Sequence, residues 1–174
     1  MPLLDRNGNA GDRWTRSEGA AIGNIPAAIV PWEVLVEALD VQESEQVIGV
    51  LIPNNIAFSE VAPFLPRLAL IAIAFPAYAD GRGFSLARQI RRAGFAGEIR
   101  ASGPLIADQF AYALSCGFDT IELPEANAAR QPVPQWLHAK DSFSATYQRG
   151  YGETGRNILD QRRAARPAAA VEAE

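Results

Sequence analysis

The chain has 174 residues, of which 48% are apolar and 21% are charged, and its formal net charge at pH 7 is −4. This length and apolar content allow one domain with a buried core and exclude wholesale disorder. The acidic balance disfavours nucleic-acid binding through bulk charge.

The scarcity of metal-binding side chains excludes several cofactor classes. A single cysteine, Cys116, excludes an internal disulfide and a self-contained iron–sulfur cluster or Cys-based zinc site. A single histidine, His138, excludes a His-rich metal site. We also find no haem, nicotinamide or flavin signature, so we predict no metal site and assign no cofactor.

The ends of the chain and its apolar runs bear on location. The N-terminus lacks the basic-then-apolar profile of a signal peptide. The longest apolar stretch, 68–79, is interrupted by Pro76 and is too short to cross a membrane. We therefore expect a cytoplasmic protein without membrane or nucleic-acid partners.

The first half of the chain predicts alternating helices and strands. Residues 1–27 are polar and Gly-rich, and we expect them to be poorly ordered or to hold one small strand. The pattern then predicts a helix at 31–39, a buried strand at 46–53, a short helix at 59–65, and a strand at 68–75. The last of these is apolar at every position, which is typical of a strand covered on both faces.

The second half continues the alternation. The pattern predicts a helix at 84–94 ending at Gly94, a strand at 97–102, a helix at 104–117 between Pro104 and Gly117, a strand at 119–123, and a last helix at roughly 134–148. Phe143 and Tyr147 of that last helix, four residues apart, predict a docking face. Residues 151–174 predict a flexible tail.

This order of elements predicts a single α/β domain over residues 28–150. We expect an open, mostly parallel sheet of about four strands with helices packed on it. A half-barrel of β/α units is the alternative. In both architectures, ligands bind at the carboxyl ends of the strands.

A segment rich in arginine and glycine, 79–103, follows the best-defined strand. Its turn at Asp80–Ser85 leads into a helix, whose free N–H groups and positive dipole end favour an anion. Gly81 and Gly83 would permit unusual backbone angles and close approach, and Asp80 or Ser85 would cap the helix. The alternative is a ligand-free tight turn in which Asp80 caps the helix or pairs with Arg82.

The candidate site residues fall into three groups. We predict that an anion is bound by Gly81, Arg82, Gly83, Ser85, Arg88, Arg100, Ser102 and Gly103. Asp80 and Asp108 are the candidates for moving a proton or orienting an arginine. Arg91 and Arg92 would contact an acidic partner, although a solvated helix face also explains them together with Arg88.

Arg100 is unusual because it lies within a predicted strand. A buried arginine needs a partner, and Glu98, two residues away, would share its face. Asp80, Arg82, Arg100, Ser102 and Asp108 could converge on one crevice, or form a structural ion-pair network. Cys116, near a predicted helix C-terminus, is expected to be a packed structural residue.

Several segments of the chain resemble one bacterial family. The segments are "FPAYADGRGFSLARQIRR", "GFAGEIRASG", "ADQFAYALSCGFDTIEL" and "FSATYQ". They resemble the domain of unknown function 934 family, uncharacterised proteins described as probable oxidoreductases involved in sulfite reduction. The resemblance covers 28–148 and is strongest over 75–123.

The resemblance implies a link to assimilatory sulfur metabolism and supplies no catalytic residues. We expect an accessory protein or subunit in assimilatory sulfite reduction, which binds an anion at the Asp80–Ser85 turn and contacts sulfite reductase or its electron donor. The alternatives are an oxidoreductase or other enzyme acting on a sulfur oxyanion or sulfur-linked nucleotide, and a non-catalytic interaction module. Six-electron reduction of sulfite needs redox cofactors, so we do not expect this chain to be the reductase alone.

Overall fold

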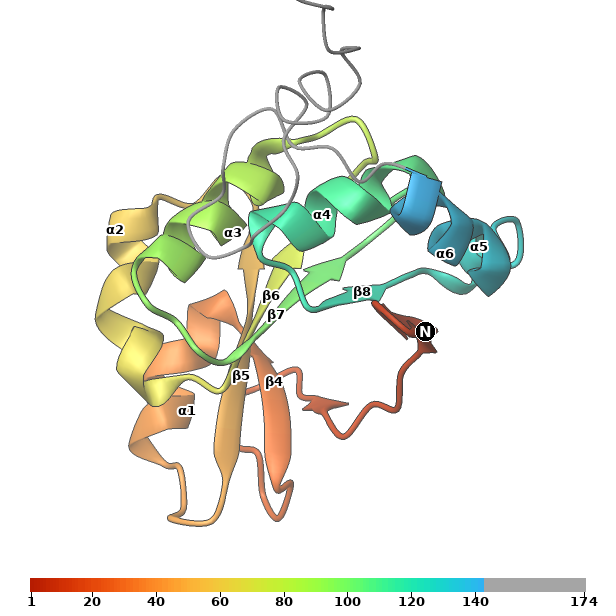
Figure 1. Cartoon of the computed structure of the whole chain (residues 1–174). Coiled ribbons are helices and arrows are strands. Elements are labelled where there is room, and N and C mark those ends of the chain that lie inside the picture. The colour runs from red at the N-terminus through yellow and green to blue at the C-terminus, as the bar shows by residue number, and fades with distance from the viewer. Residues whose placement is uncertain (143–174) are drawn as a thin grey trace, which may run out of the picture.

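The structure is a computed structural model that describes residues 1–142 (Figure 1). The part of the predicted last helix beyond Ser142 lies outside the described residues. So do the docking face of Phe143 and Tyr147 and the predicted tail at 151–174.

One eight-stranded sheet forms the centre of the described chain (Figure 1). Six neighbouring strands run parallel in chain order, namely β3 (Thr15–Arg16), β4 (Ala27–Pro31), β5 (Val47–Pro53), β6 (Leu70–Ala74), β7 (Glu98–Ser102) and β8 (Thr120–Glu122). Beyond β8, the strand β1 (Leu3–Asp5) pairs antiparallel with both β8 and β2 (Gly8–Asn9). The sheet is therefore mostly parallel, as predicted, but larger than the four strands expected.

The sheet is strongly curled. Arg16 on β3 forms an ion pair with Glu122 on β8, although four strands lie between β3 and β8. In a flat sheet these two strands would be about 24 Å apart, because neighbouring strands are spaced by about 4.8 Å. Two side chains cannot bridge that gap, so their contact requires the edges of this sheet to bend towards each other.

The two faces of the sheet carry different side chains. The outward residues of successive strands are apolar and belong to one core with the helices, as illustrated by Val30, Val50, Ile71 and Ile99. On the inner face, β4, β5 and β6 present small or apolar residues that pack around Trp14. Strands β7 and β8 present the polar inner residues Glu98, Arg100, Ser102, Thr120 and Glu122.

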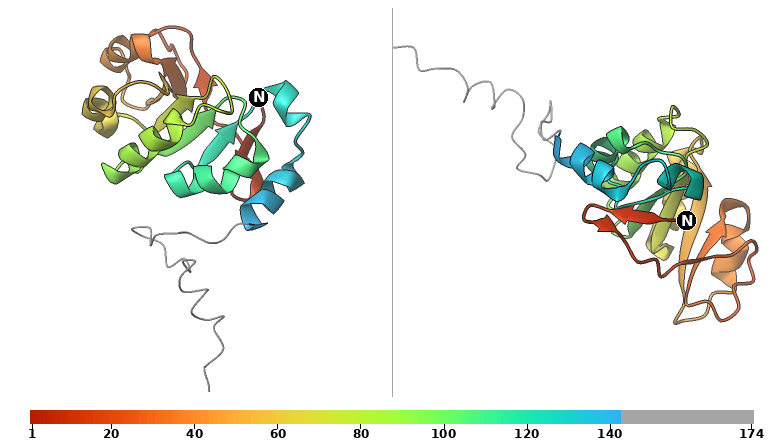
Figure 2. Two further views of the ribbon diagram at one scale, coloured as in Figure 1. Left: turned by 90° about the horizontal axis from the view of Figure 1, so that it is seen from above. Right: turned by 90° about the vertical axis from the view of Figure 1, so that its right-hand side faces the viewer.

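The helices pack on the outer face of the sheet (Figures 1 and 2). They are α1 (Leu35–Asp40), α2 (Phe58–Val61), α3 (Arg82–Arg92), α4 (Phe110–Cys116), α5 (Glu125–Ala128) and α6 (Val133–Ser142). Helices α3 and α4 are neighbours and end at Gly94 and Gly117, which have φ values of +88° and +103°. Both glycines therefore end helices as predicted, because the left-handed region favours glycine.

Three predicted helices differ from the observed elements. The predicted 31–39 helix begins as a 3-10 helix at Trp32–Val34 and continues as α1. The predicted 59–65 helix is α2 followed by a 3-10 helix at Ala62–Arg67, because Pro63 and Pro66 interrupt regular α-helical bonding. Pro104 does not open a helix, since α4 is preceded by a 3-10 turn at Ala107–Gln109. The start of this 3-10 turn is fixed instead by Gln109, whose Oε1 accepts a hydrogen bond from the Ile106 backbone amide at 3.1 Å.

The N-terminal hairpin of β1 and β2 forms one edge of the sheet beside β8, and α6 packs against β2 (Figure 2). After the hairpin, residues 12–16 run along the inner face and place Asp12, Trp14 and Arg16 against β7 and β8. This crossing segment supplies partners to the polar inner residues, and it positions much of the network described below.

Candidate functional site

The predicted anion-binding turn is occupied by a carboxylate of the chain itself. Asp80 accepts hydrogen bonds from Nε and Nη2 of Arg82 at 2.9 and 2.6 Å, and from the Arg82 backbone amide at 3.3 Å. These bonds, followed by a contribution from the Asn54 side chain, hold the pKa of Asp80 well below its usual value. The geometry is that of the alternative interpretation, in which Asp80 pairs with Arg82.

The glycines of this turn differ from each other in how closely the chain packs on them. Neither Gly81 nor Gly83 has a positive φ, so the prediction of unusual backbone angles is wrong. A Cβ at Gly83 would lie 2.5 Å from Cζ of Phe75, so the close approach at this glycine is to the Phe75 ring. The predicted cap by Ser85 is wrong, because no side-chain hydrogen bond caps α3 at its N-cap position.

Arg100 is a buried structural arginine on the inner face, with 1% of its surface exposed. Its Nη1 and Nη2 donate to the two carboxylate oxygens of Asp12 at 2.7 and 3.0 Å. Its Nε and Nη2 donate to Oε1 of Glu98 at 3.1 and 3.0 Å, which confirms Glu98 as the partner on the same face. These acceptors engage Nε, Nη1 and Nη2, so Arg100 is not presented to an external anion.

The same network fixes the neighbouring polar residues. Thr120 donates to Oε1 of Glu98 at 2.6 Å, and Nε1 of Trp14 donates to Oε2 at 3.2 Å. Nη2 of Arg16 donates to the Ser102 hydroxyl at 3.0 Å, beside its ion pair with Glu122. The inner face is therefore a satisfied ion-pair network closed by the segment at 12–16.

Gly103 also has a structural role. Its φ is +145°, and a Cβ there would lie 2.1 Å from the carbonyl oxygen of Phe75. The position therefore admits no side chain, whatever else lies near it.

The predicted convergence on one crevice is absent from the contacts of residues 1–142. No hydrogen bond or ion pair within this range joins Asp80 or Arg82 to Arg100, Ser102 or Asp108. Asp108 is exposed at the 3-10 turn before α4. The structure thus brings Arg82 and Arg100 each to carboxylate partners of its own, and not together to one ligand.

Arg91 connects three segments of the fold. It donates to the backbone oxygens of Phe95, Gly97 and Gly117 at 2.7 to 2.9 Å, and it forms an ion pair with Asp119. Its guanidinium holds the end of α3 against the turns that precede β7 and β8. The structure therefore gives Arg91 an internal role that competes with contact to a partner.

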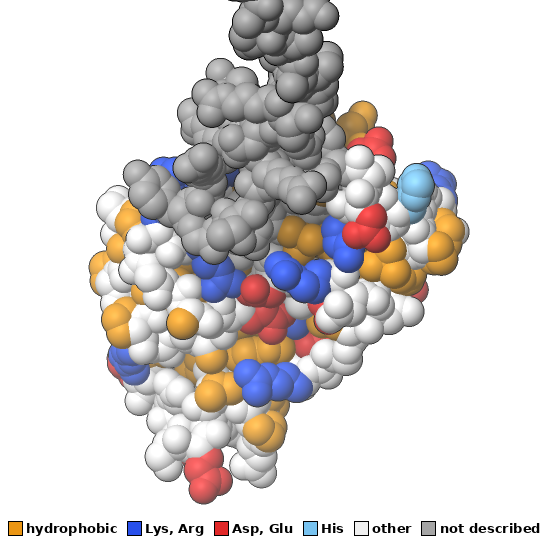
Figure 3. All heavy atoms as spheres, viewed as in Figure 1, with side chains coloured by type: hydrophobic (Ala, Val, Ile, Leu, Met, Phe, Trp, Pro, Cys, Tyr) orange, Lys and Arg blue, Asp and Glu red, His pale blue; other side chains and the backbone are white. Residues whose placement is uncertain are grey.

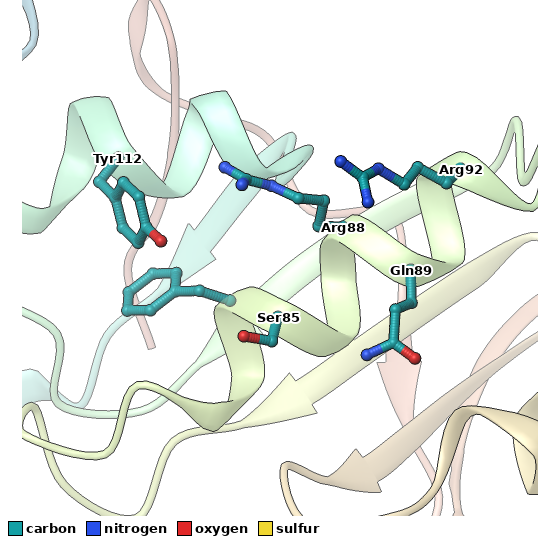
Figure 4. Close-up of a pocket in the computed structure, with 6 residues that line it drawn as sticks. Ser85, Arg88, Gln89, Arg92 and Tyr112 are labelled. Carbon is teal, nitrogen blue, oxygen red and sulfur yellow. The ribbon is translucent and has the colours of Figure 1, made fainter. Parts of the chain in front are cut away.

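A hollow of about 230 Å³ lies between α3 and α4 (Figure 4). The predicted residues Ser85, Arg88 and Arg92 line it from α3. Phe84, Gln89 and Tyr112 complete the lining, and sequence reasoning assigned them no role. We call the exposed members, Ser85, Arg88, Gln89, Arg92 and Tyr112, the α3–α4 surface.

The two arginines of the α3–α4 surface are exposed, and neither meets a carboxylate within residues 1–142. Nη2 of Arg88 lies 3.5 Å from Sγ of the buried Cys116. Figure 4 shows the side chains of Arg88 and Arg92 leaving successive turns of α3 in the same direction, while Gln89 extends away from them. This surface therefore combines two adjacent cations with an exposed aromatic ring, since Tyr112 is 53% exposed.

Aromatic packing fixes the floor of the hollow. The Phe84 ring lies 5.0 Å from Tyr112 and 5.1 Å from Phe75, measured between ring centroids. The pKa of Tyr112 is raised, chiefly by the neighbouring Cys116, and the positive charge of Arg88 partly offsets this effect. The phenol therefore stays protonated at neutral pH and can donate a hydrogen bond.

The dimensions of the hollow limit what it can hold. Sites for cofactor-sized ligands usually enclose about 300 to 1,000 Å³, so this hollow suits a side chain or a small anion better than a nicotinamide or flavin. In residues 1–142, no three His, Cys, Asp or Glu side chains are placed to hold a metal ion. No helix within this range is long and apolar enough to cross a membrane.

A second open hollow, of about 540 Å³, lies by the amino ends of β7 and β8. Its charged lining includes Arg6 and Arg91 together with Asp5, Glu98 and Asp119. Figure 3 shows that acidic and basic side chains are interleaved across the middle of the face seen in Figure 1. Charges of both signs line this second hollow, which distinguishes it from the α3–α4 surface.

Comparison with known families shows the family to which the chain belongs. The sequence model of the family described as "Bacterial protein of unknown function (DUF934)" matches residues 49–156, more than half of the chain, and the protein belongs to this family. The match includes the α3–α4 surface, whereas Asp12, Trp14 and Arg16 lie before its start. No curated protein matches the chain.

Proposed function

We propose that the protein is a cytoplasmic, non-catalytic accessory protein in assimilatory sulfite reduction, and that it docks on sulfite reductase or its electron donor through the α3–α4 surface. One observation carries the docking part of this proposal. Arg88 and Arg92 are exposed and adjacent without a carboxylate partner in residues 1–142, whereas Arg16, Arg82 and Arg100 are paired.

The composition of this surface supports an interface. Arginine and tyrosine are the residue types that, with tryptophan, dominate the binding energy of protein interfaces. Two arginines four residues apart on a helix repel each other by about 0.2 to 0.5 kcal/mol, so acidic partner groups would relieve a cost present in the free protein. On a chain of net charge −4, this basic surface also orients an acidic partner during encounter.

The link to sulfite reduction comes from the resemblance of the segments at 75–123 to proteins described in those terms. In residues 1–142, no group of His, Cys, Asp and Glu side chains is placed to hold a metal ion, and the hollow between α3 and α4 is smaller than usual cofactor sites, which favours docking over cofactor binding at this surface.

Binding measurements with purified proteins test this proposal. We expect the wild-type protein to bind sulfite reductase or its electron donor in biolayer interferometry, and the double variant Arg88→Glu with Arg92→Glu to lose that binding. Arg130→Glu, which reverses an exposed charge after α5, is the matched control and should bind as the wild type does. Absence of wild-type binding to both proteins, or equal binding by the double variant, contradicts the proposal.

One observation favours an enzyme acting on a sulfur oxyanion as a second candidate. The hollow combines two guanidinium groups with the Ser85 hydroxyl and the Tyr112 phenol, a donor set that suits a small oxyanion. Isothermal titration calorimetry with sulfite and with sulfate tests this candidate. It requires saturable binding that is lost when Arg88 is replaced by glutamine.

A further inference from the structure

The positively charged side chain of Arg88 donates to a weak hydrogen-bond acceptor. The one hydrogen bond of its side chain within residues 1–142 goes to Sγ of Cys116, at 3.5 Å. Cysteine sulfur is a weak hydrogen-bond acceptor, whereas the carboxylates that pair with Arg16, Arg82 and Arg100 form strong charge-assisted bonds. Arg88 therefore has unused capacity for a stronger acceptor.

The groups around Arg88 act mainly as donors. Ser85, Arg88 and Arg92 recur at spacings of three and four, which places them on one side of α3. The side chains of Arg88 and Arg92 leave successive turns of α3 in the same direction, and the Tyr112 hydroxyl comes from the neighbouring helix α4 (Figure 4). Guanidinium and protonated phenol groups suit an acceptor-only group such as a carboxylate.

The hollow also offers apolar surface beside these donors. The half-exposed Tyr112 ring stands against Phe84 at 5.0 Å between centroids. A free inorganic anion would leave the Tyr112 ring uncovered, whereas a peptide segment covers this ring with its own apolar atoms. The volume of about 230 Å³ suits a side chain better than a whole cofactor.

We infer that the hollow between α3 and α4 is a receptor for a carboxylate side chain on an acidic segment of a partner protein, with Arg88 as its anchor and Arg92 as the second cation. This inference rests on the docking part of the proposed function. On binding, Arg88 exchanges Cys116 for the carboxylate, and Tyr112 packs against the backbone of the segment.

A peptide titration tests the inference without sulfite reductase. The probe is a 15-residue alanine-based peptide that carries glutamates four residues apart, and its control has glutamine at the same positions. Followed by NMR at low ionic strength, the glutamate peptide should shift the backbone signals of Arg88, Arg92 and Tyr112. The signals should return towards their starting positions in 0.5 M NaCl, because salt screens exposed charges.

Variants assign the effect to the anchor. Arg88→Gln should weaken binding of the glutamate peptide at least tenfold, and Arg92→Gln by a smaller factor. Arg130→Gln should leave it unchanged. Equal binding of the two peptides, or unchanged affinity in Arg88→Gln, overturns the inference.

Two further outcomes separate this inference from the proposed function. Tighter binding of free sulfate or phosphate than of the glutamate peptide overturns the carboxylate receptor and identifies a small-oxyanion site. If the peptide fails to bind while docking on sulfite reductase still depends on Arg88 and Arg92, the inference fails and the proposed function stands. If the peptide binds while neither sulfur-pathway protein does, the proposed function fails alone.

Discussion

Replacement of Asp12 by alanine tests whether the crossing segment stabilises the inner face. The substitution removes two of the four hydrogen bonds of Arg100, a side chain with 1% of its surface exposed. Breaking a fully buried ion pair costs about 3 to 5 kcal/mol. Because the Asp12 side chain is 33% exposed and Glu98 still pairs with Arg100, we expect about 2 kcal/mol.

For a chain of this length, that loss corresponds to a fall in Tm of about 4 to 8 °C. Urea unfolding followed by tryptophan fluorescence measures the free energy, and calorimetry measures Tm. Asp108→Ala is the matched control, because Asp108 is exposed and forms no ion pair in residues 1–142. If Asp12→Ala is as stable as Asp108→Ala, the network does not contribute in the way described.

Three further predictions follow from the same structure. Gly83→Ala should lose about 1 to 3 kcal/mol of stability in urea unfolding because its Cβ meets Phe75, while Gly81→Ala should be near neutral, and equal effects would refute this packing argument. Arg91→Gln should lower stability by about 1 to 2 kcal/mol and Arg92→Gln by less than about 0.5 kcal/mol. The reason is that Arg91, unlike Arg92, donates hydrogen bonds to three backbone oxygens and pairs with Asp119 in residues 1–142, and the reverse order would contradict that assignment. Although burial raises the pKa of Asp12, its hydrogen bonds and its proximity to Arg100 lower this pKa below the ordinary 3.8. The stability difference between wild type and Asp12→Ala should therefore be full above pH 3.8 and shrink as the pH falls below it. A difference that does not depend on pH would contradict this linkage.

The alternation of helices and strands from β5 to β8 was predictable because each element has its own local pattern. The apolar run at β6 and the glycines that end α3 and α4 are signals within a few residues. The strands β1, β2 and β3 have only two or three residues each, too few for a periodic pattern. Their place depends on pairings distant in sequence, such as Leu3 opposite Glu122.

The partners of the arginines were predictable only where they are local. Glu98 lies two residues from Arg100 on the same strand face, so the period of two identified it. Asp12 lies 88 residues away, and no pattern connects it to Arg100. The partners of Arg91 are mostly backbone oxygens, which have no signature in the side-chain sequence.

The candidate site moved along α3 for a related reason. The Asp80–Ser85 turn has the composition of an anion site, but Asp80 itself meets Arg82. The spacing of Ser85, Arg88 and Arg92 places them on one side of α3, although the prediction from sequence grouped Arg92 with Arg91. Tyr112 joins them only because α4 packs beside α3, which is a consequence of the fold as a whole.

Growth of a strain that lacks this gene tests the central claim most directly. The strain would be supplied with sulfite, sulfide or cysteine as the sole sulfur source, and complemented with wild type, the Arg88→Glu and Arg92→Glu double variant, or Arg130→Glu. The account predicts slow growth on sulfite alone, rescued by wild type and Arg130→Glu but not by the double variant. Normal growth of the uncomplemented strain on sulfite, or full rescue by the double variant, would contradict it.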